Sequence, residues 1–189
     1  MDRVAIFVDG ANMYYAQKRL GWFIDFRKLL TYFRAHLGMK VAEASYYTAV
    51  DPANRTRDIT FHDYLLHSGY VLRTRPMKGG GEYIDEPPWE RVSLAVDMSI
   101  DMLLAMPHYD VCAILSGDGN FERVVETLRA KGKRASIIAH PEMTSRELRN
   151  VIGLNFSDLR DLETYISRTD RTPEERGAAA EAAATKQGA

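Results

Sequence analysis

Two stretches of sequence, VAIFVDGAN at residues 4–12 and DVCAILSGDGN at residues 110–120, decide the expected fold. Each contains a short apolar run that ends at a glycine and an aspartate, which is typical of a buried strand followed by a sharp turn. A helical pattern follows each run. Strands that alternate with helices predict an α/β fold with a parallel sheet covered on both faces.

The same alternation continues along the chain. Further strands are expected at residues 43–50, 70–76 and 134–140. Helices are expected at residues 11–21, 25–38, 59–69, 89–106, 120–132 and 144–152, with a last ordered segment at 156–166. The 89–106 segment is apolar almost all round, which predicts a largely buried helix. Residues 78–88 are rich in glycine and proline and predict an exposed loop.

Composition describes an ordinary soluble domain. Of the 189 residues, 46% are hydrophobic and 27% are charged, and this length suits one domain. Residues 1–167 are predicted to form it, and residues 168–189, which lack bulky apolar side chains, are predicted to be a disordered tail. No signal peptide or apolar run of about 18 residues is present, so we expect a cytoplasmic protein without membrane contact.

Charge and cysteine content narrow the function classes. The formal net charge is −1, so any nucleic-acid contact must come from a local basic patch. The single cysteine, Cys112, excludes an intramolecular disulfide. It lies in the apolar run VCAIL, where a packed strand residue is expected.

Aspartates stand at the ends of the two deciding strands. Asp9 and Asp118 are each flanked by glycine, and if their strands are neighbours both carboxylates enter one crevice at the carboxyl edge of the sheet. Oxygen ligands of this kind suit Mg²⁺ or Mn²⁺. Asp97 lies inside the apolar 89–106 helix, where a carboxylate needs a partner or a cation, and Glu90 and Asp101 lie on roughly the same face.

Each acid also has a structural interpretation. Asp9 can cap the helix that follows it, Asp118 can be a turn residue, and Asp97 can pair with a buried arginine or with backbone amides. Asn12 and Asn120 can cap helices or point an amide at the crevice.

Basic and aromatic residues flank the expected crevice. Arg73, Arg75 and Lys78 follow the third strand, and Arg146 and Arg149 follow the fifth. The candidates for RNA contacts are Asn12, Arg75, Lys78 and Arg146. Tyr14, Tyr15 and Tyr83 can stack on bases. The alternatives are a solvated charged surface and tyrosines that pack within the fold.

The segments VAIFVDGANMYY, LAVDM and AILSGDGNFERVVETLRAKGKRASIIA resemble the NYN domain family, in its LabA-like branch of the PIN-like nuclease superfamily. The resemblance spans about residues 3–166. It implies a three-layer PIN-like fold whose parallel sheet has about five strands in the order 3-2-1-4-5. It also implies RNA cleavage that depends on Mg²⁺ or Mn²⁺.

Carried over to this sequence, the resemblance makes three aspartates the catalytic and metal-binding candidates: Asp9, Asp97 and Asp118. Asn120 and Glu90 are further metal-ligand candidates. Two positions depart from the family pattern, because Arg91 and Asn120 stand where relatives carry acids.

Two hypotheses follow. The first is an endoribonuclease acting on single-stranded RNA. The alternative is a catalytically degenerate NYN domain that binds RNA or a protein partner, or a second copy of itself, for regulation. A phosphotransfer domain with paired aspartates is disfavoured, because Ala11 stands where the second acid would be.

Overall fold

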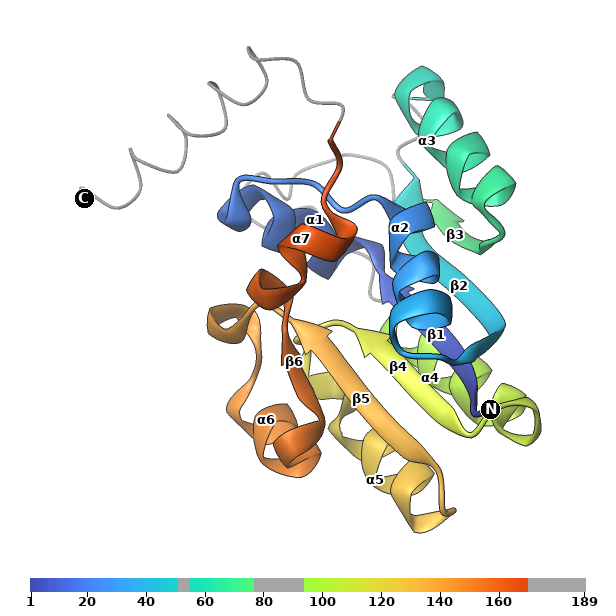
Figure 1. Ribbon diagram of the computed structural model, residues 1–189, viewed down its shortest axis with the longest axis vertical. Coiled ribbons are helices and arrows are strands. Elements are labelled where there is room, and N and C mark those ends of the chain that lie inside the picture. Colours follow the sequence, from blue (N-terminus) through green and yellow to red (C-terminus); the bar gives the residue numbers. More distant parts are fainter. Residues whose placement is uncertain (51–54, 77–93, 170–189) are drawn as a thin grey trace.

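The computed structural model describes residues 1–50, 55–76 and 94–169 (Figure 1). Its centre is a sheet of six parallel strands in the order β3-β2-β1-β4-β5-β6. The strands are β1 (Arg3–Asp9), β2 (Lys40–Val50), β3 (Val71–Pro76), β4 (Val111–Leu115), β5 (Arg134–Ala139) and β6 (Phe156–Asp158). The predicted fold class and the order of the first five strands are confirmed. The sixth strand was missed because its three residues are too few to show a strand pattern.

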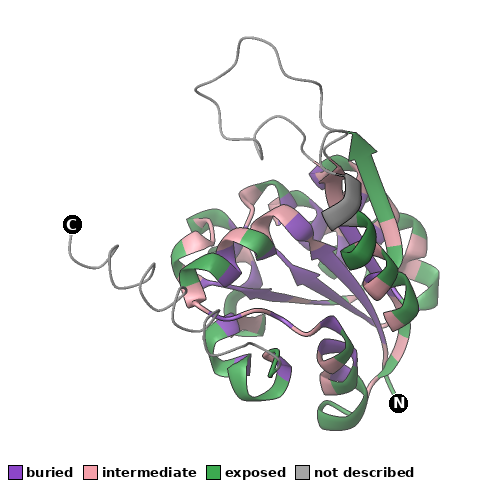
Figure 2. Ribbon diagram, turned by 90° about the horizontal axis from the view of Figure 1, so that it is seen from above, coloured by how far each residue is buried: buried purple, intermediate pink, exposed green. Residues whose placement is uncertain are grey.

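Helices cover both faces of the sheet (Figures 1 and 2). One face carries α1 (Gly10–Leu20), α2 (Phe26–Thr31), α3 (Arg55–Ser68) and α7 (Glu163–Ile166), and the other carries α4 (Ala95–Ala105), α5 (Glu122–Ala130) and α6 (Arg146–Ile152). Strand β1 shows why two layers form. Its residues Val4, Ile6 and Val8 face the first layer and Ala5 and Phe7 face the second, since side chains alternate along a strand.

Short single-turn elements complete the chain. They are a π-helix, η1 (Tyr32–His36), and the 3₁₀ turns η2 (Met106–His108), η3 (Gly119–Phe121), η4 (Pro141–Met143), η5 (Gly153–Asn155) and η6 (Leu159–Leu162). The helix expected at 25–38 is therefore α2 continued by η1. Asp25 caps it as expected, accepting hydrogen bonds from the amides of Arg27 and Lys28.

The prediction that the apolar α4 is largely buried was wrong. Met98 and Met102 are buried against the sheet, whereas Val96, Ile100 and Leu104 are exposed. Only one side of α4 contacts the sheet, and among the described residues no further layer covers the other side. The apolar composition of this segment thus predicted a helix correctly but did not predict how much of the helix is buried.

Cys112 is buried in β4, as expected of a packed strand residue. No helix in the described ranges is long and apolar enough to cross a membrane. The expected loop at 78–88 and most of the expected tail at 168–189 lie outside the described residues.

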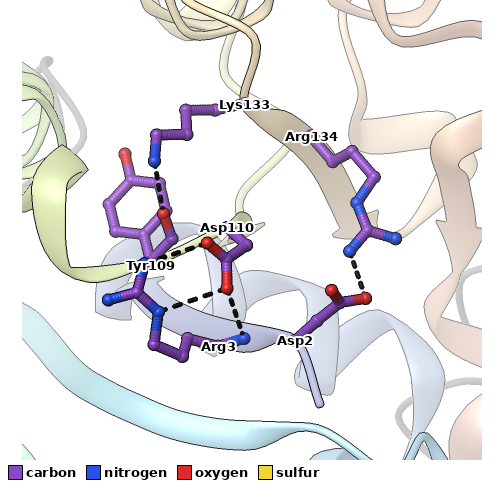
Figure 3. A network of polar contacts seen from close by, with 6 residues as sticks. All are labelled: Asp2, Arg3, Tyr109, Asp110, Lys133 and Arg134. Atoms are coloured by element: carbon purple, nitrogen blue, oxygen red, sulfur yellow. Dashed lines mark hydrogen bonds and ion pairs between the residues drawn. The ribbon is translucent and has the colours of Figure 1, made fainter.

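A polar network joins the amino ends of three strands, at the edge opposite Asp9 (Figure 3). Asp110 accepts hydrogen bonds from the backbone amide of Arg3 (2.9 Å) and from its guanidinium (2.9 and 3.2 Å). Lys133 donates to the carbonyl of Tyr109 (2.7 Å), and Arg134 pairs with Asp2. The network fixes β1, β4 and β5 in register where the chain enters the sheet.

Asp110→Asn should lower the melting temperature at pH 7, and this loss should shrink in acid. The hydrogen bonds from Arg3 hold the pKa of Asp110 well below its usual range. A carboxyl with a lowered pKa contributes stability above its unfolded pKa of about 3.9, and this contribution is lost as the pH falls further. Thermal melts of wild type and variant from pH 7 to pH 2.5 measure the difference between their melting temperatures. The exposed-acid control Asp63→Asn should show none, and a difference that does not narrow between pH 7 and pH 2.5 would contradict the assignment.

Candidate metal site

Asp9 and Asp118 meet at the carboxyl ends of the neighbouring strands β1 and β4. The Oδ2 atom of Asp9 accepts a hydrogen bond from the Ser116 hydroxyl (2.9 Å), and that hydroxyl oxygen accepts one from the Asp118 amide (3.1 Å). Ser116 is fully buried. The serine therefore connects the Asp9 carboxylate to the backbone of Asp118, which is a role that the sequence interpretation missed although Ser116 directly precedes the GDG turn.

Asn12 fixes the start of α1 against the same turn. Its side-chain oxygen accepts a hydrogen bond from the backbone amide of Gly117 (3.1 Å), and the backbone amide of Asn12 donates to Oδ1 of Asp9 (3.1 Å). The Asn12 oxygen thus already has a partner in the protein. Its expected RNA contact stays a prediction.

Both acids also have local structural roles, as the alternative interpretations of a cap for Asp9 and a turn residue for Asp118 predicted. Asp9 caps α1 through the Asn12 amide, and Asp118 caps η3 through the Asn120 amide (2.9 Å). The exposed Asn120 side chain donates a longer hydrogen bond to Oδ2 of Asp118 (3.3 Å). A carboxylate has about four acceptor positions, so capping leaves each acid able to bind a cation.

The electrostatics of the pair fit a cation. Burial raises the pKa of Asp9, hydrogen bonds from Asn12 and Ser116 oppose this, and the negative charge of Asp118 raises the pKa further. The net pKa is raised, so the protein alone does not fully stabilise the ionised form. A divalent cation would supply the missing positive charge, and the oxygen donors suit Mg²⁺ or Mn²⁺.

Two glycines let the backbone close around the acids. A Cβ on Gly117 would lie 2.2 Å from the carbonyl oxygen of Met143, and one on Gly10 would lie 2.5 Å from the carbonyl oxygen of Tyr47. The Ser145 amide donates to the Gly117 carbonyl (2.9 Å). Gly10 therefore permits a close approach to the backbone of β2, and Gly117 permits a close approach between the GDG turn and the loop that follows β5.

Asp97 has a different partner. Arg75 on β3 forms a bidentate ion pair with it, with N–O distances of 2.6 and 2.7 Å. One helical turn further on, Asp101 accepts from Arg73 (3.1 Å) and from the Tyr47 hydroxyl (2.7 Å). The expectation that Asp97 is buried is corrected, since its side chain is 31% exposed. Of the partner or cation expected for it, the structure shows a partner, the exposed Arg75.

These ion pairs line a cavity of their own. It has a volume of about 290 Å³ and is bordered by Arg73, Thr74, Arg75, Leu94, Asp97 and Asp101. Within the described ranges, no three or more acids, histidines or cysteines cluster so as to hold a metal ion. The candidate metal site therefore comprises Asp9 and Asp118, while Asp97 lies with Arg75 at this separate cavity.

The remaining candidates divide into two groups. Glu90, Arg91, Lys78 and Tyr83 lie outside the described residues. Arg146 is exposed and directly follows Ser145, whose hydroxyl is the nearest atom to a Cβ built on Gly119. Arg146 thus lies beside the GDG turn, and its expected RNA contact stays a prediction. Arg149 instead covers the ring of Phe156, 3.8 Å from its centroid.

Comparison with known proteins identifies the family. The sequence model of the NYN domain matches residues 3–160. The chain belongs to the NYN domain family. It is also 38% identical, over 174 residues and 90% of each chain, to the low amplitude and bright protein LabA of Synechococcus elongatus. The expected LabA-like relationship is therefore confirmed, and the chain is a nuclease-like NYN domain.

A solved structure shares the fold. A protein of unknown function from Vibrio parahaemolyticus superposes with a TM-score of 0.68, covering 87% of this chain and 96% of that one. Because the two are only 22% identical, the likeness concerns architecture alone.

Proposed function

We propose that this NYN domain is an endoribonuclease that cleaves single-stranded RNA with one Mg²⁺ or Mn²⁺ ion held by Asp9 and Asp118. The observation that carries the proposal is the position of these two acids at the ends of adjacent parallel strands, where the Ser116 hydroxyl joins the Asp9 carboxylate to the backbone amide of Asp118. The raised pKa of Asp9, caused first by burial and further by the charge of Asp118, supports it, because a cation would stabilise the ionised form that the protein alone does not.

The chain's own groups have distinct tasks in this mechanism. Asp9 and Asp118 bind the ion, and the Asn120 side chain lies beside them and donates a hydrogen bond from its NH₂ group to Asp118. A divalent ion held there supplies Lewis-acid stabilisation of the charge that builds up on a phosphodiester. The amino terminus of α1, which begins at Gly10, adds positive potential for the phosphate.

The charge balance of the chain favours a flexible, briefly held substrate. With a net charge of −1, the domain lacks the broad positive field that avid duplex binding requires. Local cations near the GDG turn, such as Arg146, can contact a single strand that bends to reach them.

A second candidate function is RNA or protein binding without cleavage. The observation that favours it is that Asp97, the third acid expected at the metal, is instead paired with Arg75 at a separate cavity, which leaves the site with two acids. The amide of Asn120 in place of an acid has the same effect.

An assay of labelled single-stranded RNA with Mg²⁺, with Mn²⁺ or with chelator tests the choice. We expect cleavage only with metal, and its loss in Asp9→Asn, which keeps the cap but removes the charge. Asp161→Asn makes the same chemical change at an exposed acid of η6 and should cleave normally. RNA binding without cleavage at any metal concentration would favour the binding module, and cleavage in chelator would exclude the metal mechanism.

A further inference from the structure

Helix α1 presents aromatic and basic side chains to solvent immediately after Asp9. Its buried side consists of Gly10, Met13, Ala16 and Gln17. The other side carries Ala11, Tyr14, Tyr15 and Lys18, which share one face because they are three or four residues apart. The sequence interpretation left open whether these tyrosines pack within the fold or contact bases.

The geometry of this face favours a contact surface. Tyr14 is 45% exposed, and its ring meets that of Tyr15 edge to face, with 5.1 Å between centroids and an interplanar angle of 82°. The Lys18 ammonium lies 4.3 Å from the Tyr14 centroid and 5.8 Å from the Tyr15 centroid. Tyr15 is partly buried and therefore supports the more exposed ring.

We propose that Tyr14, Tyr15 and Lys18 form a stacking site for an unpaired base of the RNA strand whose phosphate lies at Asp9 and Asp118. The location of this site rests on the proposed function, whereas base binding itself does not. Tyrosine rings stack on any base, and a neighbouring cation contacts the backbone. Tyr14 lies five positions after Asp9 along the helix, a rise of about 7.5 Å, which is on the order of one nucleotide step.

The charges around the site favour a nucleic acid over a protein partner. The first turn of α1 contains no acid, and its last turn carries Lys18 and Arg19. The exposed aliphatic side chains Val96, Ile100 and Leu104 lie on α4, in the helix layer on the opposite face of the sheet. A polyanion with flat aromatic faces matches two tyrosines beside a lysine, whereas an apolar protein surface does not.

Binding of a fluorescein-labelled RNA pentanucleotide by the full chain in chelator tests the site without requiring cleavage. Tyr14→Leu should weaken binding at least about fivefold, the lower end of the measured value of one base–aromatic stack. Tyr14→Phe keeps the ring and should bind normally. The matched control is Tyr165→Leu, because Tyr165 is also 45% exposed but lies on α7 against His36 and Tyr32.

A base deletion scan decides whether the contact is stacking. Each pentanucleotide in the scan lacks one base at a different position. Wild type should bind one of these strands more weakly, by about the same factor that Tyr14→Leu loses with the intact strand. Tyr14→Leu should be insensitive to that same deletion. Equal sensitivity of both proteins at every position, an unaffected Tyr14→Leu, or no binding by wild type would each overturn the stacking site.

The outcomes separate this site from the nuclease itself. RNA binding that depends on Tyr14 in a chain that never cleaves would exclude the enzyme and retain the stacking site. Metal-dependent cleavage with an unchanged KM in Tyr14→Leu, together with a flat deletion scan, would exclude only the stacking site.

Discussion

Asp118→Asn should abolish metal-dependent RNA cleavage while leaving the fold intact. Asp118 supplies one of the two carboxylates of the site, and asparagine can still accept the hydrogen bond from the Asn120 amide that caps η3. Loss of a residue that only orients a metal ligand costs about 10–100-fold. Loss of the ligand charge itself should exceed that, as measured by initial rates on labelled single-stranded RNA with Mn²⁺.

The stability of the same variant separates charge from capping. Without metal, Asp118 contributes to raising the Asp9 pKa, so Asp118→Asn removes a like-charge repulsion. Melts in chelator should show a protein equally stable or more stable by up to about 1 kcal/mol. Asp118→Ala also removes the cap and should instead lose about 0.5–2 kcal/mol.

Metal addition completes the comparison. An ion that binds only the folded state should stabilise wild type by about 2.7 kcal/mol when its concentration is one hundred times its Kd, and so raise the melting temperature. The ion should raise the melting temperature of Asp161→Asn as much as that of wild type, and the melting temperature of Asp118→Asn much less. An Asp118→Asn variant that cleaves at the wild-type rate would show that Asp118 is a cap and nothing more.

The sequence predicted this pair of acids because the relevant rule is local and geometric. Apolar runs mark β1 and β4, and parallel strands bring their carboxyl ends to one edge. Asp9 and Asp118 are the acids at those ends, so their proximity follows once the strands are neighbours, as they are. The Ser116 bridge was not predicted because a hydroxyl's partner depends on backbone positions that only the folded turn defines.

Asp97 shows where such reasoning fails. Its apolar neighbours predict a buried carboxylate, yet its partner Arg75 comes from β3, and the register that aligns them is set by sheet and helix packing. Asp101 likewise accepts a hydrogen bond from Tyr47 on β2, a residue 54 positions away. The buried extent of α4 was overestimated for the same reason, since burial depends on what lies against a helix as well as on its composition.

Gly117→Ala should be among the most destabilising single changes near the site. Its new Cβ would lie 2.2 Å from the Met143 carbonyl oxygen, 2.8 Å from the Met143 carbonyl carbon and 2.9 Å from the Cα of Thr144. All three are backbone atoms, so no side chain can rotate away. Hydrogen bonds fix this loop at both ends, from the Met143 amide to the His140 carbonyl and from the Ser145 amide to the Gly117 carbonyl.

Forcing an extra carbon into such a contact costs about 1–3 kcal/mol or more, which corresponds to a fall in melting temperature of roughly 3–10 °C for a chain of this length. Gly119→Ala is the matched control, because its Cβ would meet only the side chain of Ser145, at 2.9 Å from Oγ and 3.2 Å from Cβ. That contact can relax by a small movement of one side chain, so Gly119→Ala should melt closer to wild type.

Gly117→Ala should also slow cleavage, since Gly117 lies between Ser116 and Asp118 and any shift of its backbone separates the two acids. Scanning calorimetry of the two variants in parallel measures the difference, and equal melting temperatures would mean that the loop after β5 yields without cost and does not hold the acids in place.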